Sequence, residues 1–190
     1  MAKGLNKCIN FYFIVFRPIP YERILKSQNT LKSFIGEYLP NYDVFPVKGD
    51  GLCTFHAFIK GIHSLRGLVI SMDDLYNTLK EHLMMFKDHY KEYHESGCDL
   101  IKDLDSMMKA PLLNYDSDTG DLYLLALGHA FDVNIVVFRS TDDHCNIYHL
   151  TDENASYPET LFFGRSHSVH IDPIIPKAMF KVGTFNALFN

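Results

Sequence analysis

The sequence predicts an α+β fold, in which helices flank a small β-sheet. Two observations support this prediction. Between residues 21 and 108, apolar side chains recur at offsets of three and four, which is the helical period. The C-terminal half instead contains short β-branched and aromatic runs separated by Asp, Asn and Ser turns. Neither an internal repeat nor a linker divides the 190 residues, so a single domain spanning 1–190 is expected.

The helices are predicted from apolar stripes and from residues that start and stop helices. Ser71 with Asp74 resembles an N-cap, and a stripe that reaches Tyr93 predicts one long helix ending near Gly97. The first helix is expected in two pieces around Asn29-Thr30. The predicted helices cover residues 21–38, 53–62, 72–96, 100–108 and 121–130.

The strands are predicted from β-branched and aromatic runs that turn residues bound. The run at 133–138 has the continuous apolar character of a buried strand. The last strand is expected to end at Pro173, because proline cannot donate to a ladder. The predicted strands cover residues 9–16, 44–47, 133–138, 145–150, 160–163 and 168–171.

Charge and hydropathy exclude two classes of partner. With 18 Lys and Arg against 23 Asp and Glu, the net charge is −5, whereas nucleic-acid-binding domains usually carry a basic excess. The apolar run at 11–16 is far shorter than the ~20 residues of a membrane-spanning helix. Asn10, Arg17 and the lack of a small-residue cleavage site argue against a signal peptide. We therefore expect neither a nucleic acid nor a membrane as partner.

The four cysteines predict reduced thiols in a reducing compartment. Cys8, Cys53, Cys98 and Cys145 are spread along the chain without a CxxC pair. This spacing matches neither a zinc ribbon nor the dense disulfide framework of a small secreted domain. We expect no metal and no cofactor.

A cysteine placed to act as a nucleophile follows a glycine turn. In Gly49-Asp50-Gly51-Leu52-Cys53, the cysteine opens a predicted helix. Unpaired N–H groups and the helix dipole stabilise a thiolate there, and the same N–H groups can hold a developing oxyanion. Taken alone, a buried structural cysteine is the simpler explanation of this segment.

A histidine and an aspartate lie two residues apart in a predicted strand far downstream. In His167-Ser168-Val169-His170-Ile171-Asp172, alternation places His170 and Asp172 on one face of the strand. A carboxylate beside an imidazole fixes its tautomer and supports its charged form. Taken alone, a surface His–Asp pair is the simpler explanation, and His167 is a rival for the catalytic role.

Together, the two segments resemble the ovarian tumour (OTU) family of cysteine proteases. Gly49 to Cys53 is similar to the family's Asp-Gly-x-Cys motif, and His170-Ile171-Asp172 to its terminal His-aromatic-Asp signature. Residues 121–126 followed by 134–138 look like the family's helix and central strand. The resemblance spans 44–174, with 1–43 and 175–190 as flanking elements, and departs from the usual pattern at Leu52 and Ile171.

The resemblance implies a papain-type cysteine protease fold, with a nucleophile at a helix N-terminus, and a deubiquitinase activity. Cys53 would attack the carbonyl of the bond that follows the C-terminal glycine of ubiquitin, His170 would carry the proton and Asp172 would orient His170. The backbone N–H groups of Asp50, Gly51 and Cys53 would form the oxyanion hole.

The resemblance is greatest to compact viral OTU domains, which implies further expectations. An interferon-induced ubiquitin-like modifier is a second expected partner. The expected location is the cytoplasm, which is that of the host if the protein is viral. The chain is also expected to be part of a larger viral polyprotein or replicase. Three alternatives stay open. They are a catalytically silent ubiquitin-binding domain, a polyprotein-processing protease, and a structural viral protein with an accidental motif.

The other histidines are expected to have no catalytic role. His56 and His63 share one helix face, where packing or hydrogen bonding is expected. His82, His89 and His94 are expected on a solvated helix face, and their spacing matches no common zinc motif.

Overall fold

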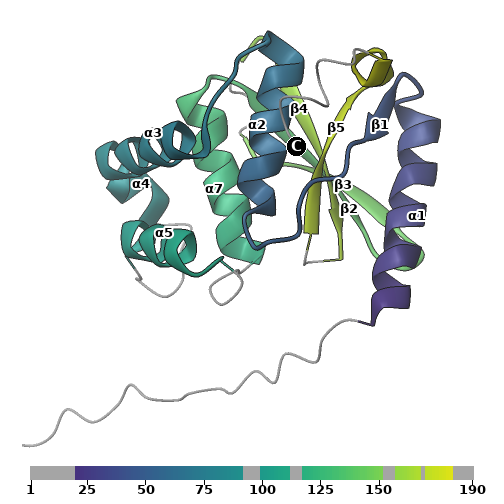
Figure 1. The fold of residues 1–190 in the computed structure, drawn as a ribbon, viewed down its shortest axis with the longest axis horizontal. Helices are drawn as coiled ribbons and strands as arrows, with labels where there is room; N and C mark the ends of the chain where they lie inside the picture. Colours follow the sequence, from purple (N-terminus) through teal and green to yellow (C-terminus); the bar gives the residue numbers. More distant parts are fainter. Residues whose placement is uncertain (1–19, 92–98, 112–116, 152–156, 168–169, 182–190) are drawn as a thin grey trace, which may run out of the picture.

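The computed structural model describes residues 20–91, 99–111, 117–151, 157–167 and 170–181 (Figure 1). The predicted strand at 9–16 lies outside the described residues. The helices are α1 (Tyr21–Tyr38), α2 (Cys53–Arg66), α3 (Met72–Met85), α4 (Lys87–Lys91), α5 (Leu100–Lys109) and α7 (Ser117–Ala130), followed by the 3₁₀ turn η1 (Lys177–Lys181). The strands are β1 (Tyr42–Val44), β2 (Asn134–Ser140), β3 (Cys145–His149), β4 (Thr160–Ser166) and β5 (His170–Pro176).

The strands form one five-stranded sheet in the order β1-β5-β4-β2-β3. Strands β2 and β4 run parallel, and the other neighbouring pairs are antiparallel. Four of the five strands come from the C-terminal half, and β1 joins them at the edge beside β5. The predicted α+β architecture is therefore confirmed.

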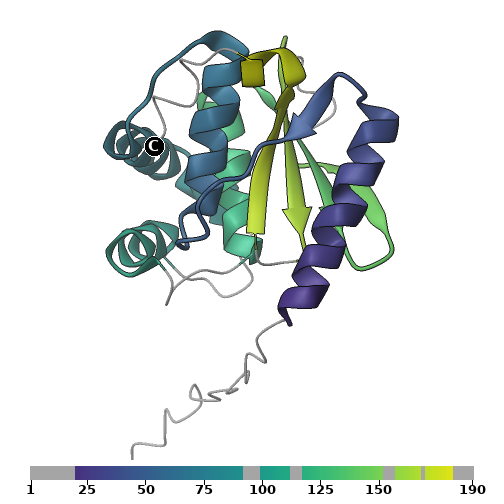
Figure 2. The same cartoon turned by 45° about the vertical axis from the view of Figure 1, so that its right-hand side comes forward.

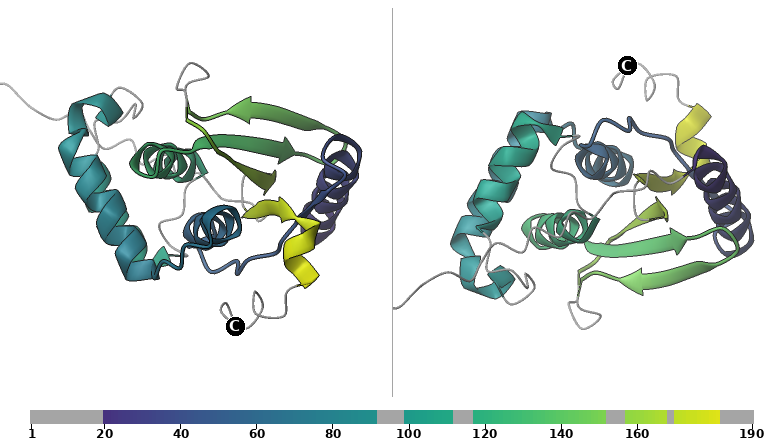
Figure 3. Two further views of the ribbon diagram at one scale, coloured as in Figure 1. Left: turned by 90° about the horizontal axis from the view of Figure 1, so that it is seen from above. Right: turned by 90° about the horizontal axis from the view of Figure 1, so that it is seen from below.

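Helices cover both faces of the sheet, and strand alternation decides which residues each helix buries. Val136 and Phe138 pack with α1, whereas Ile135 and Val137 pack in the larger core with α2 and α7. Figure 3 shows α1 on one side of the sheet, and α2 and α7 on the other. Helices α3, α4 and α5 lie beyond α2 and α7, where Leu75, Leu79 and Leu83 of α3 join the larger core.

The expected long helix after Ser71 is wrong in its second half. The Ser71 side chain caps α3 as predicted by accepting from the N–H of Asp74, but α3 ends at Met85 and α4 starts at Lys87. The change of direction leaves Phe86 46% exposed and buries Tyr90. The Tyr90 hydroxyl lies 2.8 Å from Nε2 of His82 and 2.7 Å from Nδ1 of His129. Because His129 belongs to α7, the local pattern of apolar residues does not show that the helix ends before Tyr90.

His82 therefore contradicts the prediction of a solvated histidine face. It is partly buried against Tyr90, whereas His89 is exposed and His94 lies outside the described residues. Burial, followed by the charges of His129 and His89, lowers the pKa of His82. The reason for the error is that the partner ring, His129, comes from α7 and is distant in sequence.

Helix α1 and strand β5 differ from the prediction for tertiary reasons. Helix α1 continues through Asn29-Thr30, where the Thr30 hydroxyl donates to the carbonyl of Asp142 at 2.9 Å. The last strand does not end at Pro173, because Pro173 still pairs with Phe163 of β4 and its carbonyl accepts from the N–H of Phe45 at 2.9 Å. The ladder then continues at Ile174.

The remaining boundaries shift by a few residues. Helix α2 continues to Arg66, where Gly67 adopts a left-handed φ of 66° and closes it. Helix α7 begins at Ser117, four residues before the predicted start, and β1 covers 42–44 in place of 44–47. Among the described residues, no helix combines the length and apolar character needed to cross a membrane.

Candidate active site

Cys53 is the first residue of α2, as the turn before it predicts. Gly51 has a φ of 85°, a left-handed conformation that costs other residues more than glycine. The carboxylate of Asp50 accepts from the N–H of Leu52 at 3.0 Å and so holds the turn closed. Among the described residues, no side chain caps the N-terminus of α2, and Cys53 itself is 2% exposed.

The second carboxylate oxygen of Asp50 contacts α2. It lies 3.0 Å from Nε2 of His56, one turn into the helix, which matches the hydrogen-bonding role predicted for His56. Burial raises the pKa of Asp50, but the contacts with His56 and the Leu52 N–H outweigh it and leave the pKa below its usual value. Asp50 is therefore ionised, and its carboxylate links the turn to α2.

His170 and Asp172 lie at the start of β5 and meet as predicted. Nε2 of His170 is 3.0 Å from Oδ1 of Asp172, whose side chain is 5% exposed. Ile171, between them, is fully buried in the larger core, so the pair occupies the other side of the strand. A buried carboxylate needs such partners, because desolvating an unpaired charge is costly.

The segment between β1 and α2 brings the two predicted motifs together (Figure 2). The Val47 N–H donates to Oδ1 of Asp172 at 2.8 Å. A side-chain carbon placed on Gly49 would lie 3.8 Å from Nδ1 of His170, so the backbone passes close to the ring. Because this segment leads directly into Cys53, it brings the thiol near the imidazole, although the two residues are far apart in the sequence.

The electrostatics of His170 reflect both neighbours. Burial lowers the pKa of His170, but hydrogen bonds and charges from Asp172 and Cys53 outweigh burial and raise it to about 10. The imidazole is therefore protonated at neutral pH when it faces these groups. Since Nε2 contacts Asp172, Nδ1 is the ring nitrogen left for the thiol.

His167 lies away from this group. Its Nε2 is 3.0 Å from the carbonyl of Arg23 in α1 and 2.9 Å from Oδ1 of Asp142. Strand β5 begins at His170, so His167 belongs to the turn after β4. The geometry favours His170 over His167 as the imidazole partner of Cys53.

The contacts of His167 with Arg23 and Asp142 are not predictable from the sequence. Its φ of 52° and its contacts with α1 leave no local pattern, and a buried histidine before a strand gives no other signal. The oxyanion assignment to Asp50, Gly51 and Cys53 stays a prediction. The structure adds that the Leu52 N–H of the same turn is occupied by Asp50. Within the described ranges, no group of three or more His, Cys, Asp or Glu side chains is arranged to hold a metal ion.

Comparisons with known proteins identify the fold. No protein-family model matches the sequence, and no curated protein is significantly similar to it. Among solved structures, the chain is similar to the OTU domain of human OTUD1, with a TM-score of 0.59 and 16% identity over 80% of this chain and 96% of that one.

Viral and bacterial OTU structures are similar as well. The viral OTU protease domain of Taggert virus gives a TM-score of 0.54 and 18% identity over 72% of this chain and 80% of that one. An OTU deubiquitinase from Wolbachia pipientis bound to ubiquitin gives a TM-score of 0.51 and 13% identity over 73% and 98%. The chain therefore has the OTU fold, a papain-like cysteine protease architecture.

Proposed function

We propose that this protein is a thiol-dependent deubiquitinase that uses Cys53 as nucleophile, His170 as acid and base, and Asp172 as the group that orients His170. The observation that carries the proposal is the assembly of these three side chains on an OTU fold. A buried cysteine at an uncapped helix start faces an imidazole that a buried carboxylate holds.

The chemistry follows from the arrangement. With His170 protonated beside it, Cys53 acts as the thiolate, and its sulfur attacks the carbonyl carbon of the C-terminal glycine of ubiquitin. The carbonyl oxygen becomes an oxyanion, for which the N–H of Cys53 at the helix start is a candidate donor. His170 then gives its proton to the leaving lysine amine, and a thioester with Cys53 remains.

Water completes the cycle. His170 removes a proton from a water molecule as the water attacks the thioester carbon, and the carbon–sulfur bond breaks. The ubiquitin carboxylate leaves and the Cys53–His170 pair is restored. Asp172 keeps Nε2 of His170 engaged throughout, so that Nδ1 points to the reacting sulfur.

Ubiquitin is the proposed substrate because a solved OTU structure with this fold, from Wolbachia pipientis, is bound to ubiquitin. An interferon-induced ubiquitin-like modifier is the proposed second substrate. A probe built on each modifier separates the two possibilities.

The test is covalent capture with a ubiquitin whose C-terminus carries a cysteine-reactive group. Labelling that peptide mapping assigns to Cys53, and that Cys53→Ala abolishes, supports the enzyme. The matched control is Cys145→Ala, which should still label. Binding without labelling would indicate a silent ubiquitin receptor. Neither binding nor labelling of either modifier would contradict the proposal.

A further inference from the structure

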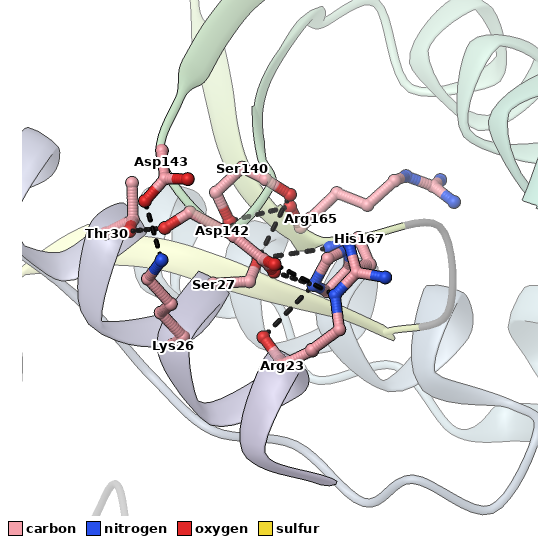
Figure 4. Close-up of polar contacts among 9 residues, drawn as sticks. All are labelled: Arg23, Lys26, Ser27, Thr30, Ser140, Asp142, Asp143, Arg165 and His167. Carbon is pink, nitrogen blue, oxygen red and sulfur yellow. Dashed lines mark hydrogen bonds and ion pairs between the residues drawn. The ribbon is translucent and has the colours of Figure 1, made fainter. Parts of the chain in front are cut away.

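A cluster of polar side chains joins α1 to the sheet at the end where β5 begins. It gathers residues from α1, from β2 and the turn after it, and from the end of β4 (Figure 4). Its members are Arg23, Lys26, Ser27, Thr30, Ser140, Asp142, Asp143 and His167; the carbonyl of Arg165 also takes part, whereas its side chain points away and pairs with Asp121. Ser27, Ser140, Arg165 and His167 are buried.

His167 is held by its backbone and by its ring. Its N–H donates to the carbonyl of Ser140 at 2.9 Å and lies 3.2 Å from Oγ of Ser27. Its Nε2 faces two acceptors, the carbonyl of Arg23 and Oδ1 of Asp142, at 3.0 and 2.9 Å. Because a carbonyl can only accept, Nε2 donates its hydrogen to Arg23, whereas Oδ1 of Asp142 lies at an ion-pair distance without a hydrogen bond.

The partners of His167 are themselves fixed. Nε of Arg23 lies 2.8 Å from Oδ2 of Asp142, so the carboxylate is shared between arginine and histidine. Burial raises the pKa of Asp142, but the hydrogen bond and charge of Arg23, together with the charges of His167 and Lys26, outweigh burial. The pKa therefore stays below its usual value. The Ser27 hydroxyl lies 3.0 Å from the Ser140 carbonyl. His167 therefore contacts a carboxylate that Arg23 also holds.

This support lies next to His170 along the ladder. The β4–β5 register pairs Ser166 with His170, so His167 follows directly after the residue that pairs with His170. His170 is the first residue of β5, and strand ends are the positions that fray first. The left-handed φ of His167, 52°, sets the direction in which the chain leaves β4.

We propose that His167 is a positioning residue for His170. Its contacts with Arg23 and Asp142 hold the start of β5 against α1. The inference rests on the proposed function. It assigns to α1 a role in holding the imidazole of His170 against Cys53, although α1 contributes no residue to the proposed triad.

The consequence is a specific change in reactivity. Without the anchor at position 167, the His170 ring samples positions away from Cys53 and stabilises the thiolate less. The titratable groups that act on His170 in the present geometry are Cys53 of α2 and Asp172 of β5. Cys53 would then react more slowly with an alkylating agent, because the thiolate is the reactive form.

The experiment compares two substitutions of similar size. His167→Gln keeps an amide N–H near the position of Nε2, whereas His167→Leu removes the donor, and both place a side chain at the same φ. The rate of iodoacetamide alkylation of Cys53 is measured by peptide mapping from pH 5 to 9. Lys26→Ala is the matched control, because the exposed Lys26–Asp143 pair belongs to the same cluster but does not contact His167.

His167→Leu should slow Cys53 alkylation at pH 6 about tenfold, equivalent to a limb displaced by about one pH unit. It should lower kcat for ubiquitin hydrolysis more than it changes KM. His167→Gln should stay within about threefold of wild type, and Lys26→Ala should not differ. Circular dichroism confirms that each variant is folded. If His167→Leu does not fold, Ser27→Ala, which removes the hydroxyl beside the His167 N–H, is measured instead and should give the same upward shift.

An alkylation profile of His167→Leu equal to that of wild type would overturn the proposal. Equal slowing of alkylation by His167→Leu and His167→Gln would also overturn the proposal, because it would show that the N–H donor at position 167 has no effect. The alkylation measurement needs no ubiquitin, so its failure is distinct from a failure of the proposed deubiquitinase activity.

Discussion

Oδ1 of Asp172 lies 3.0 Å from Nε2 of His170 and accepts from the N–H of Val47 at 2.8 Å. A single carboxylate oxygen therefore joins the imidazole to the segment that leads into Cys53. The arrangement ties the two halves of the candidate site together by hydrogen bonds, and its consequences can be measured.

Replacing His170 or Asp172 should lower turnover to different extents. His170→Ala removes the proton carrier and should lower kcat at least about a thousandfold, whereas Asp172→Asn should cost about a hundredfold, because orientation is lost but the ring remains. The measurement is hydrolysis of a fluorogenic ubiquitin C-terminal substrate. His149→Ala, at an exposed position on β3, is the control and should match wild type. A folded, active His170→Ala would contradict the assignment.

The pH profile should carry the signature of the His170–Asp172 contact. Because the pKa of His170 is raised to about 10, the ring stays protonated through neutral pH and loses its proton only as pH rises through that value. Activity should therefore rise with pH through an acid limb that belongs to the Cys53–His170 pair and fall near pH 10. Asp172→Asn should move the alkaline limb to lower pH. An unmoved alkaline limb would show that Asp172 does not act on His170.

Cysteine substitutions should separate Cys53 from Cys145. Cys53→Ala should reduce hydrolysis to background while leaving the fold intact, since it removes the nucleophile. Burial raises the pKa of Cys145 to about 11, so this thiol is inert near neutral pH and Cys145→Ala should keep full activity. Rates from the same fluorogenic substrate test both. Retained turnover in Cys53→Ala would mean that the cysteine mechanism is wrong.

Two glycine substitutions should have opposite effects. Gly51 has a φ of 85°, where a Cβ costs ~1–2 kcal/mol, so Gly51→Ala should destabilise the protein and displace the turn before Cys53. Activity should fall by about tenfold or more, because catalytic geometry tolerates little displacement.

Gly36 is exposed within α1 with nothing within 4 Å of an added Cβ. Gly36→Ala should raise stability by ~0.5–1 kcal/mol without changing activity. Urea unfolding and turnover measure both effects.

The contact of His82 and His129 with Tyr90 should make stability depend on pH. Burial, followed by neighbouring histidine charges, lowers the pKa of both rings in the folded state. The unfolded chain therefore binds more protons just below pH 6.5, and stability should fall as pH drops from 7.5 to 5.5. His82→Gln and His129→Gln should flatten that dependence in urea unfolding, and His149→Gln should not. An unchanged slope in both variants would disprove the role.

Several features of the fold follow from local pattern in the sequence. The Ser71 cap, the leucine stripe of α3 and the β-branched run of β2 are recognisable because each depends on neighbours within one or two turns. The glycine turn before Cys53 and the two-residue spacing of His170 and Asp172 are local in the same sense. These patterns were enough to predict an α+β fold and to select three residues for the candidate site.

Features that depend on distant partners escaped prediction. The end of α3 at Met85 accompanies the contact of Tyr90 with His129, and Pro173 stays within β5 because Phe45 uses its carbonyl. His167 looked like a rival to His170, yet its partners in α1 lie 140 and 144 residues away. Periodicity and spacing report the geometry of one element at a time, whereas the burial and pairing of polar groups depend on which elements meet. The sequence therefore predicted the candidate triad, whereas packing decided that His170 lies beside Asp172 and Gly49 and that His167 lies against α1.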